Sequence, residues 1–262
     1  MKRIDFLGAP GVGKTTICEE LLKKYASCCI SEHNAFLDAV KIYLSKQNSI
    51  KSQFLKLGLL LPKLNSIISN AIINKTNIKL IDSIIENERS FMEKVDEIYC
   101  NSNNPYSSRK ISGYNSFIRK MQIWHLINNY FIDNKFVLSD ESIPQRIFGI
   151  YGVRETTDND LYLIEEYYKT MPLPTALVFI ESDIDQIFEN IKKRYEENNL
   201  LIPGHQNVDA SVLKKRIKAS VYITRTGYDI LKDRGANVFK VDAKKTINEN
   251  SVLIMDYLRK IN

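Results

Sequence analysis

The sequence predicts an α/β protein with a five-stranded parallel sheet and helices on both faces. Five short apolar runs are spread along the chain, and segments of helical periodicity separate them. Strands that alternate with helices pair in parallel, because each crossover helix returns the chain to the same end of the sheet. The predicted strands cover residues 3–7, 27–31, 135–141, 175–182 and 237–243.

Length and composition favour one domain over residues 1–262, since 44% of the chain is hydrophobic. The first residues contain no signal-peptide core. The most apolar run, residues 54–64, is interrupted by Lys56 and Pro62 and falls short of the roughly 18 apolar residues of a membrane span. Four cysteines follow neither a zinc-ligand nor a disulfide spacing. We therefore expect a cytoplasmic protein with reduced thiols and no membrane partner.

The net charge of +6 suits either nucleic acid or an anionic small substrate. Basic residues are spread along the chain, and the densest cluster, residues 213–218, is typical of a solvated helix face. The pattern favours a small-molecule partner over nucleic acid. It favours no particular oligomeric state.

The stretch GAPGVGKTT fits the pattern G-x-x-x-x-G-K-[ST] and lies between a predicted strand and a predicted helix. Such a loop turns its backbone N–H groups toward phosphate oxygens, and the following helix N-terminus adds partial positive charge. Lys14 is expected against the β- and γ-phosphates of ATP, and the Thr15 hydroxyl on Mg²⁺. A tight turn without a ligand is the alternative. The expected nucleotide-binding residues are Gly8, Ala9, Pro10, Gly11, Val12, Gly13, Lys14, Thr15 and Thr16.

About a hundred residues separate the second and third predicted strands, far more than one crossover helix needs. Helical patterns fill this gap, over residues 35–46, on both sides of Pro62, over 84–100 and over 115–131. We expect residues 35–134 to form a helical insertion. Ligands collect at the carboxyl ends of parallel strands, so the insertion is placed to roof an acceptor site. A purely structural packing role is the alternative.

Three acids follow predicted strands and should share one edge of the sheet. Asp140 is expected to bind Mg²⁺ or the acceptor hydroxyl, because charge at the end of a buried strand is otherwise costly. Glu141 either polarises a nucleophile or caps the next segment. Glu32 is a candidate base for the acceptor's proton. A helix N-terminal carboxylate is its alternative role.

With these positions, the chain resembles the P-loop nucleoside and nucleotide kinase superfamily, most closely its deoxynucleoside kinase and thymidylate kinase branches. The run PLPTALVFIESDIDQIFENIKKRYEEN is similar to the family's fourth strand and lid helix. The resemblance implies a lid over residues 192–210 that includes Lys193 and Arg194, and whose arginine reaches the transferring phosphates and packs against the base. It also implies that the chain at Ala243 passes the adenine, and that Glu32 is the general base.

The chain departs from this family after the third strand. Deoxynucleoside kinases carry Glu-Arg-Ser there and thymidylate kinases Asp-Arg, whereas this chain has Asp140, Glu141 and Ser142. The missing arginine weakens the assignment of a nucleoside or nucleotide acceptor. Arg146 and Arg154, shortly downstream, are candidates to reach the same space.

Two further residues are candidates for the acceptor site. Gln122 could hydrogen-bond a base and Trp124 could stack on it, although a tryptophan on a helix face is more often a core residue.

These features together predict an ATP-dependent kinase that transfers the γ-phosphoryl group to a small acceptor. A nucleoside or nucleotide is favoured, other hydroxyl compounds stay open, and so does GTP as donor. The alternative is a regulatory P-loop NTPase in which Asp140 holds Mg²⁺ and Glu141 activates water. A non-catalytic nucleotide-binding module is a third hypothesis.

Overall fold

The computed structural model describes residues 2–47, 50–59, 61–75, 77–101, 107–151, 158–198 and 209–261. Its described residues include a five-stranded sheet of order β2-β3-β1-β4-β5, in which every pair is parallel. The predicted α/β class and all-parallel sheet are thereby confirmed; β1 begins one residue before its apolar run, and the other four strands are shorter than theirs. The strands are β1 (Lys2–Leu7), β2 (Cys29–Ser31), β3 (Phe136–Ser139), β4 (Ala176–Glu181) and β5 (Val238–Asp242).

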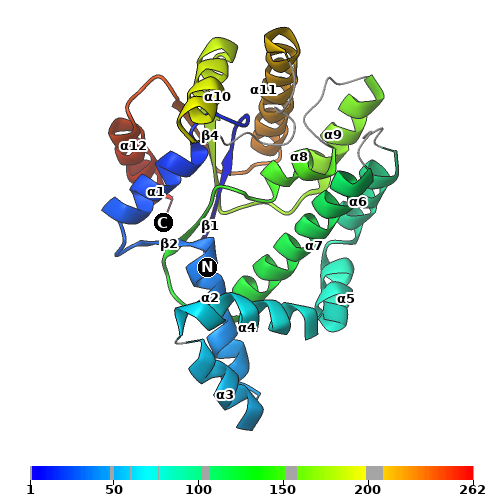
Figure 1. Cartoon of the computed structure of the whole chain (residues 1–262), viewed down its shortest axis with the longest axis vertical. Helices are drawn as coiled ribbons and strands as arrows, with labels where there is room; N and C mark the ends of the chain where they lie inside the picture. Colours follow the sequence, from blue (N-terminus) through cyan, green and yellow to red (C-terminus); the bar gives the residue numbers. More distant parts are fainter. Residues whose placement is uncertain are drawn as a thin grey trace.

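Helices make up most of the remaining described chain (Figure 1). They are α1 (Lys14–Lys24), α2 (Glu32–Ser45), α3 (Ile50–Gly58), α4 (Pro62–Lys75), α5 (Asn77–Asn87), α6 (Arg89–Asn101), α7 (Ser107–Tyr130), the 3-10 turn η1 (Pro144–Arg146), α8 (Ile147–Ile150), α9 (Asp158–Thr170), α10 (Ile184–Asn198), α11 (Ala210–Asp233) and α12 (Ile247–Lys260). Within the described ranges, none of them is both long and apolar enough to span a lipid bilayer.

Two apolar layers cover the two faces of the sheet, because successive side chains of a strand point to opposite sides. Ile4 and Phe6 of β1 pack with residues of α1, α10 and α12. Leu7, on the other face, packs with residues of α2, α7 and α9. Figure 1 shows α1 and α12 together on one side and α7, α8 and α9 on the other.

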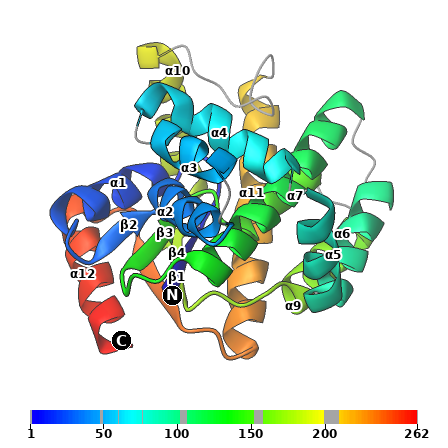
Figure 2. The same ribbon diagram turned by 90° about the horizontal axis from the view of Figure 1, so that it is seen from below.

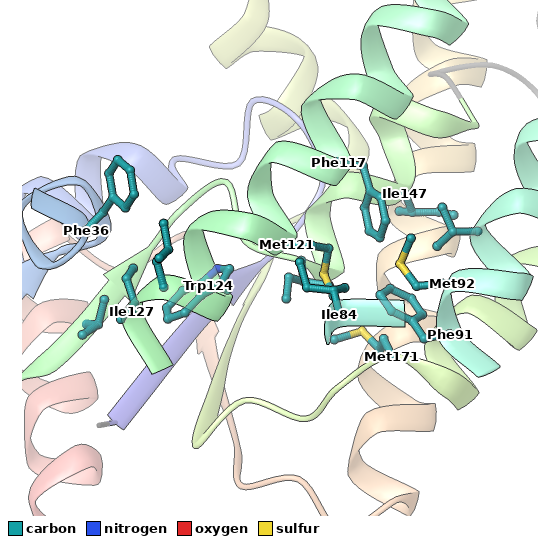
Figure 3. Packing of buried hydrophobic residues seen from close by; sticks show 14 of the residues in the cluster. Phe36, Ile84, Phe91, Met92, Phe117, Met121, Trp124, Ile127, Ile147 and Met171 are labelled. Carbon is teal, nitrogen blue, oxygen red and sulfur yellow. The ribbon is translucent and has the colours of Figure 1, made fainter. Parts of the chain in front are cut away.

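The larger layer extends well beyond the sheet. Phe91 of α6 meets Phe117 of α7 and Tyr167 of α9 edge to face, with ring centroids 5.6 and 5.0 Å apart. Figure 3 shows this cluster running from Phe36 past Trp124 to Phe91. Burial of large side chains on this scale holds the helices that follow β2 onto the sheet.

Helices α2 to α7 occupy the chain between β2 and β3, where helical periodicity was predicted. Figure 2 shows α3 and α4 beside α2, and both contact it. The prediction of one long helix over residues 84–100 is wrong, because α5 ends at Asn87 and α6 begins at Arg89. The Asn87 side chain donates to the backbone oxygen of Ser83 (2.7 Å) and so competes for a carbonyl near the helix end.

Helices α7 and α8 cross through two glycines. A Cβ atom built on Gly113 would lie 1.7 Å from the carbonyl oxygen of Gly149, whereas one on Gly149 would find its nearest neighbour 3.7 Å away. Only a hydrogen at position 113 permits this approach. The crossing holds α7 next to the segment that follows β3.

Candidate active site

The glycine-rich loop joins β1 to α1 as the sequence predicts. Gly11 and Gly13 have φ angles of +91° and +96°, which side-chain-bearing residues rarely adopt. A Cβ atom on Gly11 would lie 2.7 Å from Cγ1 of Ile191 in α10. Asn190 of α10 also donates to the backbone oxygen of Gly11 (3.1 Å). The loop shape therefore depends on glycine and is supported by α10.

The first turn of α1 has the properties of an anion site. Its N-cap residue, Gly13, supplies no side-chain hydrogen bond, and the first turn contains no acid. The backbone N–H groups there keep their partial positive charge. Thr16 is exposed in the same turn.

Lys14 folds back over the loop and is buried. Its ammonium donates to the backbone oxygens of Gly8 (2.8 Å) and Ala9 (3.3 Å). Burial lowers the pKa of Lys14 from 10.5 to about 8, while the negative charges of Glu141 and Asp140 oppose this shift. The lysine charge is thus held inside the loop, next to two carboxylates.

Thr15 and Asp140 meet across the site. The Thr15 hydroxyl donates to Oδ2 of Asp140 (2.7 Å), and the backbone N–H of Glu141 donates to Oδ1 (3.0 Å). The parallel pairing of β1 with β3 brings the two together, because both residues follow the carboxyl ends of adjacent strands. A hydroxyl and a carboxylate oxygen are ligands that Mg²⁺ accepts when phosphate and water complete its shell.

Glu32 begins α2, directly after β2, and its carboxylate lies 13% exposed. Lys120 of α7 pairs with one oxygen, and the hydroxyl of Ser139, at the end of β3, donates to the other. Because Ser31 of β2 pairs with Leu138 of β3, Glu32 and Asp140 lie at the same edge of the sheet, as predicted. Lys120 is nearly buried. Sequence reasoning missed both partners.

A second acid lies deeper, inside β1. Asp5 is fully buried, and its carboxylate lies 3.3 Å from Nε of Arg3 without a hydrogen bond to either oxygen. Burial raises the pKa of Asp5 from 3.8 to about 6, the charge of Arg3 opposes this, and that of Glu32 adds to it. Arg3 also donates to the backbone oxygen of Pro172 (2.7 Å) and lies over the Trp124 ring, 5.2 Å from its centre.

The segment after β3 lies against the loop. Gln145, which the sequence analysis did not single out, accepts from the backbone N–H of Gly8 (3.4 Å). Arg146 donates to the hydroxyl of Ser116 in α7 (2.9 Å), and another of its nitrogens lies 3.9 Å from the Glu141 carboxylate. Glu141 is more than half exposed. Arg146 thus links α7 to Glu141, which follows Asp140.

The predicted lid helix is α10. Lys193 and Arg194 are exposed on it, and Lys193 pairs with Glu197 at 3.8 Å. The charge of Arg194 contributes to the lowered pKa of Lys14, so the guanidinium lies within electrostatic range of the loop. Residues 199–208 of the predicted lid, and Arg154, lie outside the described residues.

The other predicted residues lie elsewhere in the fold. Ala243 follows β5 and donates its backbone N–H to Glu181 (2.9 Å). Gln122 and Trp124 are both buried in α7, and Trp124 belongs to the larger apolar layer. Trp124 is therefore a core residue, which the sequence analysis gave as the alternative to stacking on a base.

On its other side, the loop borders a small hollow at the carboxyl end of β4. Ala9 and Val12 line it from the loop, and Thr224 and Arg225 line it from α11. The buried hydroxyl of Ser182, at its wall, has no hydrogen-bond partner among the residues that the structure describes.

Neither a comparison of the chain with protein-family models nor a search of curated proteins finds a match.

Proposed function

We propose that the protein is a P-loop phosphotransferase that moves the γ-phosphoryl group of ATP to a hydroxyl of a small acceptor. The contact of Thr15 with Asp140, made beside the buried Lys14, carries this proposal. It joins a phosphate-binding loop to a metal-binding carboxylate at one sheet edge, which is the arrangement that phosphoryl transfer needs. The favoured acceptor is a nucleoside or nucleotide, with other hydroxyl compounds as further members of the class.

The resemblance to nucleoside and nucleotide kinases supports the same reading of the fold. We propose that the sheet is that of a P-loop kinase, and that residues 35–134 are an insertion that roofs the acceptor. The ion pair between Glu32 and Lys120 supports this role for α7, because it ties that helix to the edge where the acceptor would lie. We propose that the protein acts on this small molecule in the cytoplasm.

The residues present fit a magnesium ion. Thr15 and Asp140 would hold it together with phosphate oxygens, and the bound ion supplies positive charge that neutralises the transferring group. Within the described residues, no group of three or more His, Cys, Asp or Glu side chains is placed to bind a metal by itself.

The chain's own residues supply the rest of the chemistry. The loop N–H groups and Lys14 hold the β- and γ-phosphates, and Arg194 adds charge from α10 as the group transfers. Glu32 accepts the proton of the acceptor hydroxyl. Lys120 and Ser139 fix the two oxygens of that carboxylate, so its direction toward the acceptor is set before substrate binds.

A regulatory NTPase is the second candidate function. Glu141 favours it, because this exposed carboxylate follows Asp140 directly. Of the nearby negative charges, it also does most to oppose the lowering of the Lys14 pKa by burial. In that reading Asp140 holds Mg²⁺ and Glu141 orients the attacking water. The two candidates therefore differ in which carboxylate serves the nucleophile.

An ADP-release assay against nucleosides, nucleoside monophosphates, sugars and amino compounds tests the proposal. We expect slow basal release, strong stimulation by one acceptor class, and loss of that stimulation in Asp140→Asn and Glu32→Gln. Glu32→Gln must still bind ATP and melt above the assay temperature, because Glu32 also pairs with Lys120. Brisk release without any acceptor that disappears only in Glu141→Gln would replace the kinase by the NTPase.

A further inference from the structure

Helices α3 and α4 carry an exposed apolar surface that the proposed reaction does not use. We call it the α3–α4 surface and define it by Phe54, Leu57, Leu61, Leu64 and Ile67. Their exposed fractions range from 38% for Leu64 to 69% for Phe54. Side chains of this size, exposed together, mark an interaction site more often than scattered apolar residues do.

The two helices that carry these side chains are in contact. A Cβ atom on Gly58 would lie 2.5 Å from Cδ1 of Ile68 and 3.9 Å from Cδ1 of Leu64, so α3 and α4 touch there. Leu59 and Ile68 are buried, and both belong to the larger apolar layer. Each helix therefore has one apolar side in the core and a second in solvent.

The charged residues in the sequence around this surface are all lysines. Residues 39–81 contain no Asp, Glu or Arg, and they include seven lysines. Those lysines are Lys41, Lys46, Lys51, Lys56, Lys63, Lys75 and Lys79. Lys56, next to Leu55 and Leu57, is exposed. A helix pair with large aliphatic residues outward and lysines as the only charged residues in its own sequence is typical of segments that lie on anionic membranes.

We propose that the α3–α4 surface binds the surface of an anionic lipid bilayer, with the five apolar side chains entering the headgroup region. A second copy of the chain fits less well, because two such surfaces would bring only positive charges together. Nucleic acid fits less well too, since its usual contacts are arginines and stacking aromatics and the segment has no arginine and mostly aliphatic residues outside.

This mode of binding needs no spanning segment. The sequence-based prediction of no membrane partner rests on the absence of such a segment, so it leaves surface attachment open. In Figure 1, α3 lies at the end of the molecule opposite α10, which supports the phosphate loop.

Vesicle sedimentation of the full chain tests this inference. We expect sedimentation with vesicles of phosphatidylcholine and phosphatidylglycerol, little with phosphatidylcholine alone, and release at high salt. Leu57→Glu should weaken binding about tenfold or more, and Lys56→Gln a few-fold. Ile132→Glu and Lys218→Gln change an exposed apolar residue and an exposed lysine elsewhere and should bind as the wild type does. Circular dichroism checks that all variants fold.

Three results would overturn the inference. The first is equal binding to neutral and anionic vesicles, or none to either. The second is an equal loss of binding in Leu57→Glu and Ile132→Glu. The third is a dimer that Leu57→Glu dissociates, or binding of DNA that Leu57→Glu abolishes, in protein that ignores vesicles.

Discussion

Lys120 of α7 pairs with Glu32 at the start of α2, although 88 positions separate them in the chain. Both side chains are largely buried, at 7% and 13% exposure. The Glu32 carboxylate also accepts from Ser139 at the end of β3. One ion pair thus fixes the candidate base and joins α7 to the sheet edge.

We expect Lys120→Met to lower the free energy of unfolding by about 3 kcal/mol, because Glu32 is left as an uncompensated buried charge. The double variant Glu32→Gln, Lys120→Met should lose clearly less than the two single losses added. Urea unfolding measures all three. Lys94→Met breaks the more exposed pair with Glu97 (2.9 Å) and should cost under about 1 kcal/mol. Strict additivity in the double variant would show that the two residues do not interact.

Asp5 makes stability depend on pH. Its pKa is about 6 in the folded protein and 3.8 in its ordinary range. Between these two pH values, the folded protein keeps a proton that the unfolded chain has released. The stability from this proton is complete below pH 3.8 and is lost as the pH rises through 6. Asp5→Asn should therefore gain about 3 kcal/mol relative to the wild type between about pH 4 and pH 7.

Urea unfolding at several pH values measures this difference. Asp133→Asn, which changes an exposed acid, serves as the control and should show no such trend. A difference between Asp5→Asn and the wild type that stays constant with pH would contradict the prediction.

The α7–α8 crossing predicts an asymmetry between two glycines. Gly113→Ala should destabilise the protein by about 1–3 kcal/mol, because its new methyl group would overlap the Gly149 carbonyl. Gly149→Ala should cost much less, since its methyl group meets only ordinary contacts. Thermal unfolding compares the two proteins directly. Equal losses would contradict the crossing as the cause, and helix propensity could not explain them, because it favours alanine over glycine at both positions.

Arg194 should act on the transferring group. We expect Arg194→Ala to lower kcat about a hundredfold with a smaller rise in KM for ATP, because the guanidinium engages charge that develops during transfer. Lys193→Ala removes a neighbouring charge that pairs with Glu197 and should change kcat little. Steady-state kinetics with the stimulating acceptor separates the two. A change confined to KM would make Arg194 a ground-state contact.

The sheet could be predicted because its signals are local. Each apolar run coincides with an observed strand; four of the runs extend past the strand ends, and β1 begins one residue before its run. Residues 27–28 were assigned to the second strand, but the N–H groups of Cys28 and Cys29 both donate to the backbone oxygen of Tyr25. They close the end of α1 before β2 begins. Asp140 likewise leaves β3 in order to reach Thr15.

The loop and its acids were also predictable, since GAPGVGKTT sets its own geometry and the acids directly follow strands. The contacts of Lys120 and Gln145 could not be predicted, because no local spacing indicates them. Lys120 contacts Glu32 from 88 positions away in the chain, and Gln145 contacts Gly8 from 137 positions away. Asp5 did leave a signal. A single acid within the apolar run RIDFL indicates a buried charge, and burial of that charge is what raises its pKa.

The place of β1 in the sheet has a consequence for synthesis on the ribosome. β1 lies between β3 and β4, and its residues pair with Phe136 and Ala176, which are translated much later. Until β3, β4 and α10 are translated, the glycine-rich loop lacks the strands on either side of β1 and the support of Asn190. The proposed nucleotide site therefore forms late, and a nascent chain that stops before β4 leaves the β4-facing edge of its first strand unpaired and open to other chains.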